Sequence, residues 1–80
     1  MREKKEKLVV AFHTTADAMK MEEVCKKARI PGRLIPVPRE ISAGCGMAWS
    51  SEEQERGRLE EVMREHRIDP QEVRVCLLWT

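Results

Sequence analysis

The sequence has few aromatic side chains and almost no excess charge. Aromatic residues make up 4% of the 80 residues, and tyrosine is absent. So few aromatic rings leave little surface for stacking nucleic-acid bases. A formal net charge of +1 attracts neither nucleic acid nor an acidic lipid surface by charge alone. We therefore expect no nucleic-acid partner.

Long apolar runs are also missing. No segment approaches the roughly 18 consecutive apolar residues that a membrane-spanning helix needs. Residues 2–7 are all charged, which is unlike the apolar centre of a signal peptide. The sequence therefore predicts no membrane partner and a cytoplasmic location.

Cysteine is scarce, and its spacing is wide. The chain has three cysteines, Cys25, Cys45 and Cys76. An odd number without a Cys-x-x-Cys pair argues against a disulfide framework and against a zinc site. Sites for soft metals need at least two nearby sulfur ligands. We expect neither a metal nor an organic cofactor.

What remains is the composition of one small folded domain, with 41% hydrophobic and 36% charged residues. Residues 1–7 are expected to be a charged flexible tail, and residues 8–80 the domain. Apolar runs and alternating patterns predict strands over residues 8–12, 33–35, 45–49 and 73–79. Apolar residues at helical spacing predict two helices, ending near Arg29 and Arg67. Thr14 or Thr15 is expected to cap the first helix, and Ser50 or Ser51 the second.

This order of elements, strand–helix–strand–strand–helix–strand, predicts an α+β fold of the ferredoxin-like, split βαβ type. Right-handed crossovers place the first and third strands at the centre of a four-stranded antiparallel sheet, with both helices on one face. Met47, Trp49 and Trp79 are expected on the opposite, open face. That face is the candidate surface for a homodimer.

One cysteine lies in an unusual setting. Cys45 stands between Gly44 and Gly46, and glycine removes side-chain cover from the neighbouring backbone. The predicted topology brings Cys45 to the same sheet edge as His13 and the start of the first helix. A nearby cation or helix N-terminus favours the reactive thiolate form of a cysteine. The alternative is a small residue that only fills the start of a strand. Cys25, on the apolar stripe of the first helix, and Cys76, in the last strand, are expected to be packing residues.

The chain resembles a known family through two segments. These segments are residues 12–18, Phe-His-Thr-Thr-Ala-Asp-Ala, and residues 30–48, Ile-Pro-Gly-Arg-Leu-Ile-Pro-Val-Pro-Arg-Glu-Ile-Ser-Ala-Gly-Cys-Gly-Met-Ala. They resemble the small bacterial selenium/sulfur carrier protein-like family. The resemblance implies that Cys45 holds sulfur or selenium as a persulfide or selenosulfide. It also implies that Arg39 and Ser42 belong to the same motif.

Two further side chains have open roles. His13 is a candidate base or thiolate partner, and the alternative is a residue that only hydrogen-bonds at a strand end. Arg39 is a candidate partner for an anionic adduct or a substrate, and the alternative is an ion pair with Glu40 or exposure to solvent.

The sequence therefore favours a carrier or thiol-relay protein over a turnover enzyme, with sulfur or selenium donor and acceptor proteins as partners. The competing hypothesis is a non-catalytic module that binds a small ligand or a protein, in which Cys45 is structural.

Overall fold

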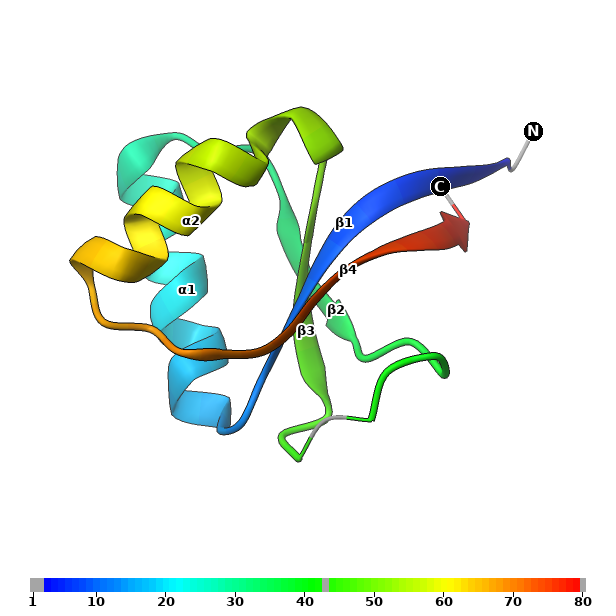
Figure 1. The fold of residues 1–80 in the computed structure, drawn as a ribbon, viewed down its shortest axis with the longest axis horizontal. Helices are drawn as coiled ribbons and strands as arrows, with labels where there is room; N and C mark the ends of the chain where they lie inside the picture. The colour runs from blue at the N-terminus through cyan, green and yellow to red at the C-terminus, as the bar shows by residue number, and fades with distance from the viewer. Residues whose placement is uncertain (1–2, 43, 80) are drawn as a thin grey trace.

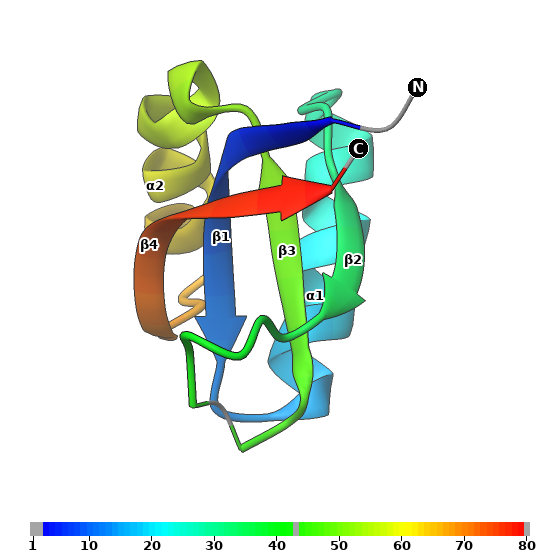
Figure 2. The same ribbon diagram turned by 90° about the vertical axis from the view of Figure 1, so that its right-hand side faces the viewer.

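A computed structural model describes residues 3–42 and 44–79 (Figure 1). The elements follow one another as β1 (Lys4–Phe12), α1 (Thr15–Ala28), β2 (Arg33–Pro36), β3 (Met47–Ser51), a short 3-10 helix (Glu53–Glu55), α2 (Arg56–Glu65) and β4 (Pro70–Trp79). The strands form one antiparallel sheet in the order β2-β3-β1-β4. Both helices lie on the same face of this sheet (Figures 1 and 2). The predicted ferredoxin-like α+β fold is confirmed.

The two strands at the ends of the chain are longer than the sequence predicts. β1 begins at Lys4 rather than Leu8, because residues 4–7 pair with Cys76–Trp79 of β4. This part of the expected tail is therefore strand, while Met1 and Arg2 lie outside the described residues. The β1–β4 ribbon extends beyond the helices (Figure 1) and curves across the sheet towards β2 (Figure 2).

The main core lies between the helices and the sheet. Its largest members are Trp49, Phe12, Leu8, Met21 and Leu59, all at most 2% exposed. Trp49 lies opposite Val10 in the β1–β3 register, so both side chains point to the helices. The expectation that Met47 and Trp49 lie on the open face is therefore wrong, since Met47 also packs against this core.

The opposite face has a smaller core of its own. Val9, Ala11, Ala48 and Cys76 are buried there under Ile41, which comes from the segment between β2 and β3. This segment, residues 37–46, is called the Cys45 loop below. It covers one end of the face that the sequence leaves open for a second copy. The homodimer itself stays a prediction.

The helix caps agree with the sequence at one start and differ at the other. Thr14 caps α1, since its Oγ1 accepts a hydrogen bond from the Asp17 N–H at 3.1 Å. Ser50 and Ser51 do not cap α2, because both belong to β3, and the Ser51 hydroxyl donates to the Pro31 carbonyl. α2 follows the 3-10 helix without a side-chain cap.

Candidate functional site

The Cys45 loop crosses the sheet face and returns to β3. Its two ends are joined where the Val37 N–H donates to the Gly46 carbonyl at 3.0 Å. A turn in its first half is closed by the Ile41 N–H, which donates to the Pro38 carbonyl at 3.0 Å. The turn points Ile41 at the sheet, where its side chain is 3% exposed. The loop is therefore anchored by an apolar side chain as well as by its backbone.

Two side chains from β4 hold the loop from the other side. The Gln71 side-chain amide donates to the Ser42 carbonyl, and its Oε1 accepts from the Gly44 N–H at 3.4 Å. The Arg74 guanidinium donates to the Glu40 carbonyl at 2.9 Å. Gln71 thus forms two hydrogen bonds to the backbone directly before Cys45. Neither Gln71 nor Arg74 could be selected from the sequence, because their partners in the loop are main-chain atoms of a distant segment.

Cys45 lies half-buried at the end of this loop. Its Sγ lies 3.2 Å from the Met47 carbonyl, to which the thiol donates, and 3.4 Å from the Met47 N–H, which donates to the sulfur. The side chain also packs against the core on the helix side. Both backbone groups of Met47 therefore contact the sulfur and orient the thiol.

The predicted meeting of distant segments does occur. A Cβ on Gly44 would lie 3.3 Å from the His13 carbonyl, which places the backbone before Cys45 against the end of β1 and the start of α1. The His13 side chain is exposed. Among the described residues, both hydrogen-bond partners of Sγ are Met47 backbone groups, so His13 does not bond to the thiol. His13 is a neighbour of the site through its backbone.

The remaining predicted site residues are on or beside the loop surface. Ser42 contributes its carbonyl, and its side chain is exposed. Gly46 has a φ of 75° and open space around its Cα, so it makes the turn that leads into β3. Arg39 is exposed, and within residues 3–42 and 44–79 it forms no ion pair with Glu40 or any other carboxylate.

The other two cysteines are buried. Burial raises the pKa of the Cys25 thiol to about 11, an effect that the nearby Arg58 charge partly offsets. Burial is also the main cause that raises the pKa of Cys76, which lies under the Cys45 loop with Glu40 nearby. Both groups are therefore kept as thiols at neutral pH, as expected for packing residues.

Neither buried cysteine is placed to pair with Cys45. Cys76 pairs with Lys7 of β1, and Ala48 pairs with Ala11, four residues further along β1. Cys76 is therefore about 13 Å along the sheet from Ala48, and Cys45 lies beyond Ala48. The end of the Cys45 loop lies near the start of α1 at Thr15. Cys25 lies about 15 Å further along this helix. A disulfide needs Cα atoms within about 7 Å. Neither thiol can therefore form a disulfide with Cys45 in this fold.

Clusters of metal ligands and membrane-spanning helices are both absent from the described residues. No group of three His, Cys, Asp or Glu side chains suited to a metal occurs in the described part of the chain. No helix over those residues is long and apolar enough to span a membrane.

A protein family matches the chain over residues 7–74, a segment that includes most of β1, all of β3 and the whole Cys45 loop. Its description is "Putative Se/S carrier protein-like". The chain belongs to this family. Among curated proteins and solved structures, no significant match to the chain is found. Ser42, Gly44 and Gly46 lie at the same end of the loop as Cys45.

Proposed function

We propose that this protein carries sulfur or selenium on Cys45, as a persulfide or a selenosulfide, between a donor protein and an acceptor protein. The observation that carries the proposal is the contrast among the three cysteines, of which Cys45 is the one that is not buried. The family supports the chalcogen, since its description names selenium and sulfur carriers.

The chemistry needs no oxidant. The Cys45 thiolate attacks the terminal sulfur of a donor persulfide, R–S–SH, forming Cys45–S–SH and releasing the donor thiolate R–S⁻. The acceptor thiolate then attacks the same terminal sulfur and releases Cys45 as a thiolate. A donor that carries R–S–SeH transfers selenium by the same exchange. Because Cys25 and Cys76 are remote, no internal thiol competes for the cargo.

The first test compares the three thiols. Iodoacetamide at pH 7.5, followed by peptide mapping, should modify Cys45 at least about tenfold faster than Cys25 or Cys76, because both of those are buried and have raised pKa values. In a separate experiment without alkylation, cysteine persulfide should add one sulfur atom to the protein, measured by intact mass. The adduct should be absent from Cys45→Ser and present in Cys25→Ala and Cys76→Ala.

Two results would count against the carrier. One is equal alkylation of all three cysteines in the folded protein. The other is a sulfur adduct that persists in Cys45→Ser. Either would favour the alternative, a small-ligand or protein-binding regulatory module in which Cys45 is structural. Such a module could bind its ligand in a cleft between β2 and the end of β4.

A further inference from the structure

A cleft of about 660 Å³ lies on the sheet face opposite the helices, beyond the part that the Cys45 loop covers. Ile35 and Pro36 of β2 line one side, and Leu78 and Trp79 of β4 line the other. The cleft exists because the β1–β4 ribbon curves across the sheet towards β2 (Figure 2). Apolar walls and a volume of roughly 300–1,000 Å³ are typical of sites for small molecules.

The floor of the cleft is more polar than its walls. Lys7 of β1 and Ser50 of β3 lie there, on the same face as Val9. Lys7 donates a hydrogen bond to the Glu52 carboxylate, and this contact lowers the pKa of Glu52. Glu52 therefore stays ionised at neutral pH, and its charge cancels that of Lys7.

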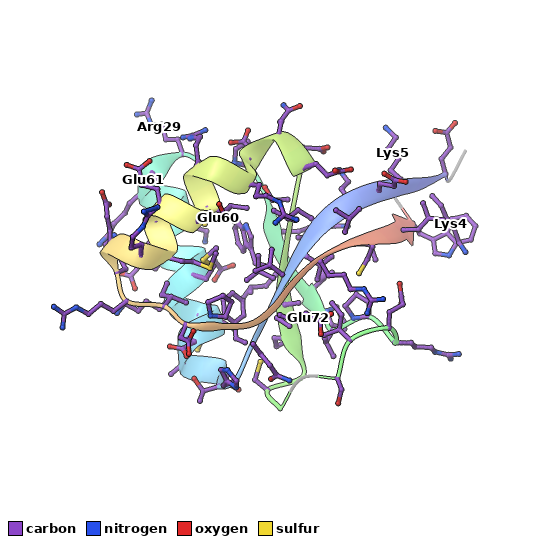
Figure 3. The ribbon with its side chains drawn as sticks, in the orientation of Figure 1. Lys4, Lys5, Arg29, Glu60, Glu61 and Glu72 are labelled. Atoms are coloured by element: carbon purple, nitrogen blue, oxygen red, sulfur yellow. The ribbon has the colours of Figure 1, made fainter. Side chains whose placement is uncertain are left out.

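Arg33 leaves the cleft with a net positive charge. It is exposed at the cleft, and within the described residues it has no carboxylate partner. Two further cations lie nearby at the projecting end of β1 (Figure 3). Lys4 has its Nζ 5.0 Å from the centroid of the Trp79 ring, and Lys5 lies opposite Leu78. Glu3 and Glu6 belong to the same segment as these lysines, so the positive charge that an anion meets in the cleft comes from Arg33.

We propose that this cleft binds a small organic anion, with a flat apolar body between Ile35 and Trp79 and a carboxylate, sulfonate or phosphate held by Arg33. This is a second site, separate from Cys45, and it goes beyond the carrier function. The Cys45 loop returns to the sheet at the end of β1, whereas the cleft lies beside Lys7 and the last residues of β4.

The probe for this site is 1-anilinonaphthalene-8-sulfonate, a flat apolar molecule with one negative charge. It should bind the full chain saturably with one-to-one stoichiometry, followed by its fluorescence. Arg33→Gln should weaken binding at least about tenfold, since a hydrogen bond to a charged group is lost. Arg64→Gln, which removes an exposed arginine of α2, is the matched control and should leave binding within about twofold. The uncharged analogue N-phenyl-1-naphthylamine should not distinguish Arg33→Gln from the unchanged protein.

Amide chemical shifts locate the probe independently of affinity. They should move at β2, at residues 50–52 and at residues 78–79, and the same pattern should persist in Cys45→Ser. This variant separates the two proposals, because it abolishes the carrier and spares the cleft. Equal weakening by Arg33→Gln and Arg64→Gln, non-saturating binding, or shifts centred on the Cys45 loop would overturn the anion site. So would preference of the cleft for an acidic peptide over the sulfonate.

Discussion

Gly32 lies where the backbone entering β2 crosses Trp49, and it has no room for a side chain. An added Cβ would lie 2.6 Å from the Ser50 carbonyl oxygen and 2.7 Å from two atoms of the Trp49 ring. Its φ of 154° is also rarely adopted by residues with side chains. Neither the carbonyl oxygen nor the buried ring can move freely. The packing of Trp49 therefore requires glycine at position 32.

We predict that Gly32→Ala lowers the free energy of unfolding by about 2–3 kcal/mol, through overpacking and backbone strain. Urea unfolding followed by circular dichroism measures the change. Gly57→Ala is the matched control, because nothing lies within 4 Å of its added Cβ and it is in α2. It should stabilise the protein by about 1 kcal/mol. If Gly32→Ala were as stable as the unchanged chain, the conclusion that Trp49 excludes a side chain at position 32 would be wrong.

The two helices end in the same way. Arg29 and Arg67 both have positive φ, at 57° and 55°. The Ile30 N–H donates to the Cys25 carbonyl at 2.9 Å, and the Ile68 N–H donates to the Met63 carbonyl at 2.8 Å. Each isoleucine is buried behind its helix. This is the Schellman arrangement, with an apolar contact between the residue after the cap and the last turn.

Arginine is an unfavourable residue at both of these left-handed positions. We predict that Arg29→Gly and Arg67→Gly each raise the free energy of unfolding by about 0.5–1 kcal/mol, because glycine adopts positive φ without steric cost. Thermal and urea unfolding would measure this gain. Lys20→Gly, in the middle of α1, should instead destabilise by about 1 kcal/mol. A loss of stability in both arginine variants would show that these side chains make contacts that matter more than φ.

The sequence predicted the order of the elements well and their ends less well. Apolar spacing was enough for the order, since each helix has one apolar face and the first strand is a continuous apolar run. The ends depend on partners elsewhere in the chain. Ser50 and Ser51 look like caps, but pairing with Leu8 and Val9 draws them into β3. Lys4–Lys7 looks like a tail until β4 is seen to run alongside it.

The candidate site was predictable in part, for the same reason. Glycines on both sides of Cys45 marked the loop, and the topology brought its end to His13. The face on which Trp49 lies could not be read from alternation alone, because both faces of the central strands are apolar. The role of Gln71 could not be predicted from the sequence for a different reason. Its partners are backbone atoms, which leave no signature in the sequence.

The whole molecule has three layers, with the helices, the sheet and the Cys45 loop stacked in that order. The loop is joined to β4 through Gln71 and Arg74, and β4 reaches the far end of the molecule at the cleft. Ile41 supplies the apolar contact beneath the loop. The position of Cys45 therefore depends on a strand at the opposite end of the sequence.

We predict that Gln71→Ala loosens this third layer without unfolding the other two. Losing two hydrogen bonds to the loop backbone should cost about 1–2 kcal/mol locally, so amide exchange over residues 39–46 should speed up about five- to thirtyfold. Alkylation of Cys76, which lies under the loop, should accelerate with it, while alkylation of Cys25, on the core face of α1, should not change. Gln54→Ala, on the exposed 3-10 helix, is the control and should alter none of these rates. Exchange that stays at the original rate in Gln71→Ala would mean that Ile41 and Arg74 hold the loop alone.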